Sequence, residues 1–198
     1  VHAAEFYAHF DCNSTIENKE TTAYNLNSLL PDDIVIHQII KVKEDAHARF
    51  SAVRRTYKYY INTCRTPFGK EYEFFMHRSP DIALMNHACE ILMEYKDFSC
   101  FSKSHTQVNN FFCTIFEAGW QQSESRYVFM ISANRFLRNM VRAIVGTMLD
   151  VGLHKTDLNE FRNIIEKGSR SDAGMSVAAK GLFLTRVEYP EDLFEKDE

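Results

Sequence analysis

Three arginines follow one another at short intervals within an apolar segment. Arg135, Arg138 and Arg142 lie at positions i, i+3 and i+7, and most residues between and after them are apolar. At 3.6 residues per turn, this pattern predicts a helix that starts at residue 134 and ends near residue 150, with its arginines on the side opposite the core. A guanidinium group in such a place binds water, a carboxylate or phosphate. The spacing alone does not choose among these three.

A second group of candidate residues lies on a predicted strand at residues 56–61. Its polar and aromatic side chains alternate, and basic residues lie on it or just before it (Arg49, Arg54, Arg55, Lys58). Basic and aromatic residues interleaved on a strand are typical of RNA-binding surfaces, because the cations meet phosphates while a ring stacks on a base. An edge strand with a solvated basic face is the plainer interpretation of the same segment.

Other kinds of chemistry find little support in the sequence. The eight histidines form no His-x-x-x-His pair, and the five cysteines form no Cys-x-x-Cys pair. We therefore expect no metal site. The glycine-rich nucleotide-binding motifs and the Gly-x-Ser-x-Gly motif of serine hydrolases are also missing, so we expect no bound cofactor.

The amino-acid composition is that of a globular protein with a slightly negative net charge. The 198 residues are 45% hydrophobic and 25% charged, as in ordinary globular proteins, and the net charge is −4. An RNA-binding role would therefore depend on local basic patches. The odd number of cysteines favours a reducing, cytoplasmic setting, and we expect no signal peptide and no membrane span. The chain starts at Val1 inside an apolar run, which leads us to expect a piece of a longer protein.

The order of predicted elements indicates an α+β fold, an antiparallel-rich mixed sheet with helices packed on one face. We expect residues 1–45 to be the remainder of an incomplete N-terminal subdomain, residues 46–190 a C-terminal subdomain, and residues 191–198 a frayed acidic tail. Residues 104–110 are expected to form a polar loop. The predicted strands cover residues 1–10, 34–42, 56–61, 111–120, 127–132 and 182–189. Besides the arginine helix, helices are predicted at residues 21–30, from Pro80 with Ser79 as N-cap, and at residues 156–167 between a Thr156 cap and Gly168.

Several separated segments match one family. The residues His-Ala-Arg-Phe-Ser-Ala at 47–52 with Tyr57, the segment 134–146, and Gly-Leu-Phe-Leu at 181–184 occur in this order and spacing in the tRNA pseudouridine synthase A family. The first residues, Val-His-Ala, resemble those just after that family's catalytic motif Gly-Arg-Thr-Asp-x-Gly. The chain is therefore identified as a member of this family, whose pseudouridine synthase fold is built from two ferredoxin-like halves.

The resemblance implies an isomerase that converts uridine to pseudouridine at positions 38–40 of the tRNA anticodon stem-loop. The family uses no cofactor and no metal, acts as a homodimer, and attacks the flipped uridine with an aspartate carboxylate. By resemblance, Arg142 pairs with that carboxylate, Tyr57 holds the base, and Leu182 forms an apolar wall of the pocket. Arg49, Arg55 and Arg138 are weaker candidates for contacts to RNA.

The family's nucleophilic aspartate would lie three residues before Val1. We therefore expect this polypeptide alone to be inactive. Two other interpretations remain open at this point. One is a noncatalytic RNA-binding α+β module, and the other is a structural domain whose arginines are solvated. A salt-sensitive affinity for tRNA would count against the second of these.

Overall fold

The computed structural model describes residues 1–103 and 110–195. Most of the loop predicted at residues 104–110 therefore lies outside the described residues. The chain divides into two compact units, each described here by itself. Unit 1 consists of Val1–Phe6 and Val53–Glu188, and unit 2 consists of Tyr7–Ala52 and Tyr189–Glu198. The division of the chain near residue 45 stays a prediction about the complete fold.

Unit 1 is built around a mixed sheet whose path runs β1-β6-β2-β5-β4, with β3 paired to β2. The pairs β1–β6 and β2–β3 are parallel, and the other pairs are antiparallel. This confirms the predicted antiparallel-rich mixed sheet. The strands are β1 (His2–Ala3), β2 (Arg54–Asn62), β3 (Phe74–Phe75), β4 (Ile115–Ser123), β5 (Arg126–Ala133) and β6 (Leu182–Glu188).

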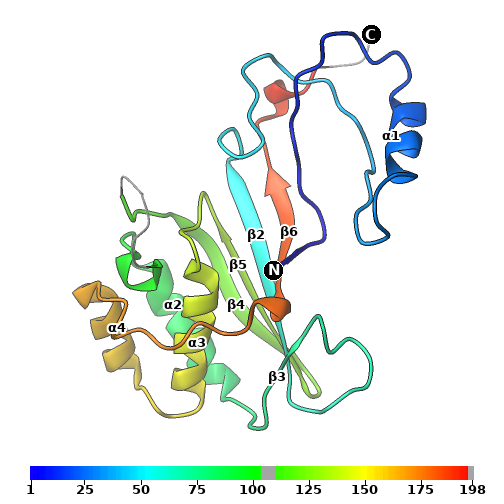
Figure 1. The fold of residues 1–198 in the computed structure, drawn as a ribbon. Helices are drawn as coiled ribbons and strands as arrows, with labels where there is room; N and C mark the ends of the chain where they lie inside the picture. Colours follow the sequence, from blue (N-terminus) through cyan, green and yellow to red (C-terminus); the bar gives the residue numbers. More distant parts are fainter. Residues whose placement is uncertain (104–109, 196–198) are drawn as a thin grey trace. The chain divides into compact units, whose positions relative to one another are not determined.

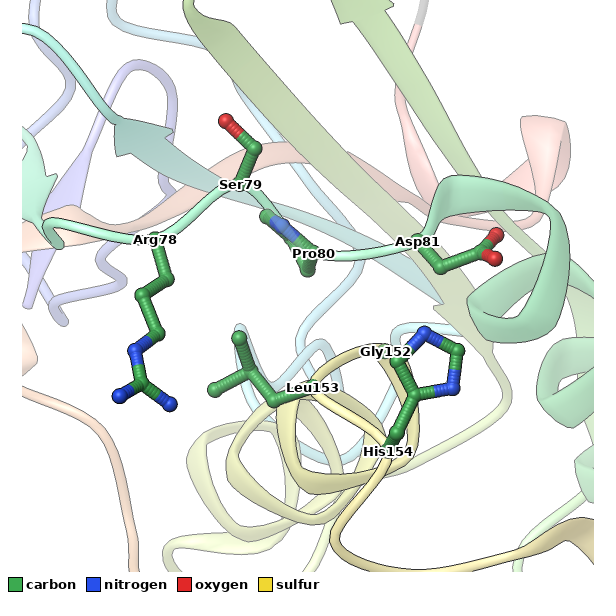
Figure 2. Close-up of a pocket in the computed structure, with 7 residues that line it drawn as sticks. All are labelled: Arg78, Ser79, Pro80, Asp81, Gly152, Leu153 and His154. Carbon is green, nitrogen blue, oxygen red and sulfur yellow. The ribbon is translucent and has the colours of Figure 1, made fainter.

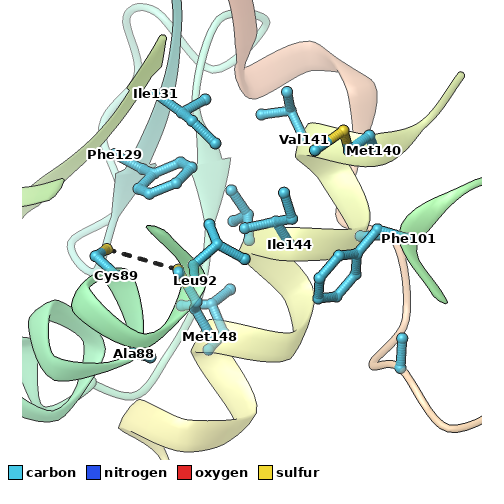
Figure 3. Packing of buried hydrophobic residues seen from close by; sticks show 14 of the residues in the cluster. Ala88, Cys89, Leu92, Phe101, Phe129, Ile131, Met140, Val141, Ile144 and Met148 are labelled. Atoms are coloured by element: carbon cyan, nitrogen blue, oxygen red, sulfur yellow. Dashed lines mark hydrogen bonds between the residues drawn. The ribbon is translucent and has the colours of Figure 1, made fainter. Parts of the chain in front are cut away.

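Helices α2 (Ile82–Met93), α3 (Met140–Gly152) and α4 (Leu158–Lys167) lie on one side of this sheet (Figure 1). The core between the two layers is apolar and fully buried. Figure 3 shows Leu92 of α2, Phe129 of β5 and Ile144 of α3 gathered there. The α+β fold with helices on one face is thus confirmed. Among the described residues, no helix is long and apolar enough to cross a membrane.

Two predicted strands are wrong or much too long. β1 covers only His2–Ala3, and residues 34–42 form no strand apart from a single bridge between Val42 and Phe194. A strand exists only where a neighbouring strand takes up its backbone hydrogen-bonding groups. Residues 34–42 have the apolar composition of a strand, but unit 2 offers them no such neighbour within the described residues.

The helix caps also differ from prediction. Asp81, not Ser79, caps α2, because its carboxylate accepts hydrogen bonds from the backbone N–H groups of residues 83 and 84. Asp157, not Thr156, caps α4. In both cases the N-cap is an aspartate one or two residues closer to the helix, because a carboxylate accepts hydrogen bonds from the free N–H groups of the first turn and is stabilised by the helix dipole. The predicted end of α4 at Gly168 is confirmed, and Gly168 has the left-handed φ of 67° that suits glycine there.

Unit 2 contains helix α1 (Lys19–Asn27), near the predicted residues 21–30, and the short turn η3 (Glu191–Leu193). The tail is not frayed as expected up to residue 195. Its acidic side chains pair with lysines, Asp192 with Lys43 at 2.8 Å and Glu195 with Lys41 at 2.6 Å. The backbone N–H of Glu195 also donates to the carbonyl of Lys41. Backbone hydrogen bonds, supported by these exposed ion pairs, therefore connect the tail to residues 41–43.

Candidate active site

Strand β2 places Tyr57 and Tyr59 on the face of the sheet that carries the helices. Tyr59 is fully buried, and Tyr57 is partly buried with its ring edge-on to Phe136 at 5.1 Å between centroids. The two positions share a face because side chains alternate along a strand. Burial raises the pKa of Tyr57, and the charge of Arg55 opposes that rise. Tyr57 therefore presents a neutral phenol ring at neutral pH.

Strand β6 brings Leu182 next to these tyrosines. Leu182 is the register partner of Tyr59, and Leu184 is the partner of Tyr57. The strand follows the turn η2 (Ala179–Gly181). A Cβ atom on Gly181 would lie 2.8 Å from the Tyr60 carbonyl oxygen and 2.9 Å from Tyr59 Cζ, so a side chain there would push β6 away from β2. Glycine at this position lets Leu182 approach Tyr59 closely.

The first residues of the chain lie along the other edge of β6. His2 pairs with Phe183 and Ala3 with Leu184, in parallel, and the N–H of Ala4 donates to the Leu184 carbonyl at 2.8 Å. The chain therefore starts beside the η2 end of β6 (Figure 1). This is the end of the strand at which Leu182 faces Tyr59.

Helix α3 begins six residues later than predicted. Residues 134–139 are not helical. They end in a turn, where Asn139, with a left-handed φ of 71°, precedes the first helical residue Met140. Phe136 and Leu137 contact the core from this non-helical segment, and their positions therefore match the helical spacing of the apolar residues in the sequence. Arg135 and Arg138 therefore do not share a helix face with Arg142. The predicted row of three arginines is wrong.

Arg142 lies in the first turn of α3 and is partly buried. Its Nε donates to the carbonyl oxygen of Val177 at 2.6 Å. It also lies close enough to Tyr59 for its charge to act on that phenol, opposing the large rise that burial gives the pKa of Tyr59. Within the described parts of the chain, no carboxylate forms an ion pair with Arg142. Arg142 thus lies near Tyr59, on the face of the sheet that carries the helices.

Residues 170–178, here called the clasp, connect these parts and were missed in the sequence. The clasp follows α4 and crosses α3 before it enters η2 (Figure 1). The carbonyl of Val177 accepts from Arg142, and the next carbonyl, that of Ala178, accepts from the Tyr59 hydroxyl at 2.8 Å. Because the acceptors are backbone atoms, no residue type in the sequence could have signalled this role.

The weaker candidates are dispersed. Arg138 is exposed in the turn before α3. Arg55, on β2, donates from Nη1 to the carbonyl of Asn134 at 2.7 Å. Arg49 belongs to unit 2, where it is exposed with its guanidinium 5.4 Å from the centre of the Phe50 ring. Within unit 1, Leu182 and Arg142 are therefore both neighbours of Tyr59, and Tyr57 lies two residues from Tyr59 on the same strand, whereas Arg49 belongs to unit 2.

A surface pocket lies elsewhere, between the start of α2 and the C-terminal end of α3 (Figure 2). Asp81 lines it, but its carboxylate caps α2 and its N–H donates to the Gly152 carbonyl at 2.8 Å. None of the candidate site residues lines this pocket. Its lining residues are Arg78, Ser79, Pro80, Asp81, Gly152, Leu153 and His154.

Comparisons with known proteins place the chain among relatives. A family model described as tRNA pseudouridine synthase matches residues 88–190. The chain is 48% identical over 196 residues to a tRNA pseudouridine synthase A of Bacteroides fragilis, which covers 98% of this chain and 78% of the relative. It is 48% identical over 200 residues to the same enzyme of Bacteroides thetaiotaomicron, covering 100% and 74% of the two chains. With that of Bacillus subtilis it shares 36% over 191 residues, covering 96% and 77%.

The similarity extends over nearly the whole chain in each of these pairs, and it includes the segments that carry Tyr57, Arg142 and Leu182. Identity at this level over this length reflects common descent with a shared fold. The chain therefore belongs to the tRNA pseudouridine synthase A family.

Proposed function

We propose that this chain carries most of the catalytic site of a tRNA pseudouridine synthase that isomerises uridine at positions 38–40 of the anticodon stem-loop. One observation carries the proposal. Arg142, Tyr57 and Leu182 come from three separate segments, and each is related to Tyr59 of β2. Leu182 is its register partner, Tyr57 lies two residues away on the same strand, and Arg142 is close enough for its charge to act on the Tyr59 phenol. The family relationship supplies the reaction class.

The reaction exchanges one bond of the nucleoside for another. The bond from sugar C1′ to uracil N1 breaks, the base turns, and a bond from C1′ to C5 forms. The proton on C5 is lost and N1 gains one, so the change is an isomerisation that needs no oxidant or reductant. Such an enzyme must extract the uridine from the stem, hold its base through the turn, and keep a carboxylate ionised at the sugar.

Each requirement has a candidate residue. The exposed part of the Tyr57 ring stacks against the flipped uracil, and Phe136 holds that ring from its edge. Leu182 forms an apolar wall of the pocket. Arg142 is a permanent cation whose Nε is held by Val177, so its Nη groups remain to bind a carboxylate.

The carboxylate itself we assign to an aspartate three residues before Val1 in the full-length protein. The direction of β1 supports this. Because β1 runs parallel to β6 and starts beside Leu182, residues before Val1 would continue alongside η2, towards Val177 and Arg142. Exposed cations, Arg138 in unit 1 and Arg49 in unit 2, together with Arg55, would contact tRNA phosphates. We further propose that the enzyme acts as a homodimer.

Tritium release from tRNA labelled at uridine C5 tests the proposal. The 198-residue chain should release no tritium above background, and the chain extended by its upstream segment should turn over. In that longer chain Arg142→Ala should lower the rate at least about 100-fold, because the nucleophile loses its preorganised partner. Arg162→Ala is the matched control, since Arg162 lies on the surface of α4 and pairs with Glu94.

Substrate choice is tested with the same assay. Transcripts in which the uridines at positions 38–40 are replaced by cytidine should release no tritium from the remaining uridines. Clear turnover by the 198-residue chain would refute the proposed location of the nucleophile. Full activity of Arg142→Ala in the longer chain would refute the role of Arg142, and tRNA binding without turnover in that chain would favour a noncatalytic RNA-binding module.

A further inference from the structure

The clasp sets the orientation of the Arg142 guanidinium group. Arg142 Nε donates to the Val177 carbonyl at 2.6 Å, and the Val177 N–H donates back to the Arg142 carbonyl at 3.2 Å. The two residues are thus joined in both directions. Any displacement of Val177 therefore rotates or shifts the guanidinium plane, and the two Nη groups move with it.

Arg170 holds the clasp in its shape. Its Nη1 donates to the carbonyls of Ala173 and Gly174 at 3.2 and 3.1 Å, and its Nη2 donates to Ser176 Oγ at 2.9 Å. One forked side chain thus ties three residues of the turn that immediately precede Val177. The planar fork of arginine suits this task, because its donors have a fixed mutual geometry.

The clasp is also fixed to α3 on its other side. Asn139 Nδ2 donates to Ser176 Oγ at 2.5 Å, and the Gly174 N–H donates to Thr147 Oγ1 at 2.9 Å. Ser176 therefore connects Arg170 to the start of α3, three residues before Arg142. The whole arrangement is a short chain of contacts from Arg170 through Ser176 and Val177 to Arg142.

We propose that Arg170 is a positioning residue for Arg142 in the reaction. This inference rests on the proposed function, because it assumes that Arg142 pairs with the nucleophile. Arg170 acts without touching the substrate. Its hydrogen bonds keep Val177 where its carbonyl can hold Arg142 Nε, so that the Nη groups meet the carboxylate in the productive geometry.

The test compares single-turnover rates of variants of the full-length protein on labelled tRNA. Arg170→Met keeps much of the side-chain volume and removes all three hydrogen bonds. At saturating enzyme its rate constant should fall about 10- to 100-fold, the cost typical of a slightly misplaced reacting group, while the enzyme concentration that gives half the maximal rate should stay within about twofold. Arg162→Met, which removes an exposed arginine of α4, should leave both constants unchanged. A rate for Arg170→Met equal to that of Arg162→Met would overturn the inference.

A second comparison shows whether the effect passes through Arg142. In an Arg142→Lys background, which keeps a positive charge at this position, Arg170→Met should lower the rate by less than about threefold, because the guanidinium that it positions is gone. A loss as large as in the wild-type background would overturn the inference. If Arg170→Met fails to fold by near-UV circular dichroism, Ser176→Ala decides, since it removes a single link. An unchanged rate in Ser176→Ala would then count against the inference.

Failure of this inference differs from failure of the proposed function. If Arg142→Ala keeps full activity, Arg142 has no catalytic role and the proposed function of the site is refuted. If Arg142→Ala is inactive while Arg170→Met reacts at the wild-type rate, the site stands and only the positioning role of Arg170 is refuted.

Discussion

Two consecutive backbone carbonyls organise the candidate site at the scale of single residues. The Val177 carbonyl binds Arg142 of α3, and the Ala178 carbonyl binds the hydroxyl of Tyr59 on β2. A hydrogen bond from a charged group contributes about 1.5–3 kcal/mol, and a neutral one about 1 kcal/mol. These two contacts therefore link α3, the clasp and β2 beside the Arg142 guanidinium.

At Gly146 the backbone of α3 lies directly against the clasp, so even a small side chain at this position would disturb their contact. A Cβ atom there would lie 1.8 Å from the Met175 carbonyl oxygen. The clasp would have to move off α3, so Gly146→Ala should lower the free energy of unfolding of unit 1 by about 1–3 kcal/mol, as overpacking does. It should also lower the single-turnover rate, because Val177 would move with Met175. Urea unfolding followed by Trp120 fluorescence measures the first effect.

Gly119 on β4 provides the matched control. A Cβ atom there would meet only Asn86 Oδ1, at 3.9 Å, which is ordinary van der Waals contact. Gly119→Ala should therefore leave the stability unchanged or raise it by up to about 1 kcal/mol. Equal stabilities of the two variants would show that the clasp does not rest on the α3 backbone as described.

The sequence predicted side chains of the site better than it predicted their surroundings. Tyr57, Arg142 and Leu182 were chosen through the family's motifs, and their catalytic roles stay a proposal. The contacts of Arg142 with Val177 and of Tyr59 with Ala178 could not be predicted, since every residue has a carbonyl group. The sequence around Asn139 and Arg170 gave no sign of a special role. Their contacts with Ser176 become visible only once the path of the clasp over α3 is known.

At the scale of elements, the alternation of polar and apolar residues predicted a strand correctly where a neighbouring strand was present to pair with it. Strands β2, β5 and β6 formed close to their predicted bounds, and β4 formed although it starts later than predicted, at Ile115, because each has a partner strand within unit 1. Residues 34–42 have similar composition but no strand. The start of α3 was misplaced for a different reason. Phe136 and Leu137 contact the core from the non-helical segment before α3, and in this sequence they lie at the same spacing as the apolar residues of the helix itself.

Helices α2 and α4 are joined by an exposed but well-aligned ion pair. The Arg162 guanidinium binds both carboxylate oxygens of Glu94, with Nη2 at 2.9 Å from Oε1. The hydrogen bond from Arg162 lowers the pKa of Glu94 below its usual 4.5. A carboxylate whose pKa is lower in the folded state stabilises the fold at pH values above the unfolded-state pKa, and that contribution disappears as the pH falls through the folded-state pKa.

Because the lowered pKa of Glu94 stabilises the fold only at higher pH, the effect of Glu94→Gln should depend on pH. At pH 7 the variant should melt at a lower temperature than the wild type, and the difference should shrink below about pH 4.5 and vanish once Glu94 is protonated in the folded protein. Thermal unfolding at pH 7 and pH 3 measures it. Glu90→Gln, within α2 and four residues before Glu94, is the control and should change the melting temperature little at pH 7 or pH 3. A gap in melting temperature that persists unchanged at pH 3 would exclude the ion pair as its cause.

At the scale of the whole molecule, the two units differ in how much apolar surface they bury. Nearly all buried apolar side chains belong to unit 1. In unit 2 the described residues include only Ala23 and Ala52 in this class, while Phe10, Leu29 and Val35 are exposed. Because burial of apolar surface is the main favourable term in folding, unit 2 should be much the less stable of the two.

This difference predicts that the chain unfolds in two steps. Trp120 is the chain's single tryptophan and is only 4% exposed within the core of unit 1, so its fluorescence reports on that unit. With increasing urea, far-UV circular dichroism should change first as α1 of unit 2 unfolds, whereas Trp120 fluorescence should stay constant until unit 1 unfolds at higher urea.

Cysteine reactivity offers an independent record of the same two steps. Cys12 in unit 2 and Cys64 in unit 1 are exposed, whereas Cys89, Cys100 and Cys113 are buried. Burial raises the pKa of these three thiols, to about 12 for Cys89 and Cys100 and about 11 for Cys113. Thiolate is the reactive form, so a thiol reagent at pH 8 should modify two cysteines rapidly and the other three only at urea concentrations at which Trp120 fluorescence changes. If the buried thiols became reactive together with the first dichroism step, the two units would unfold as one, and the unequal burial would not determine the order.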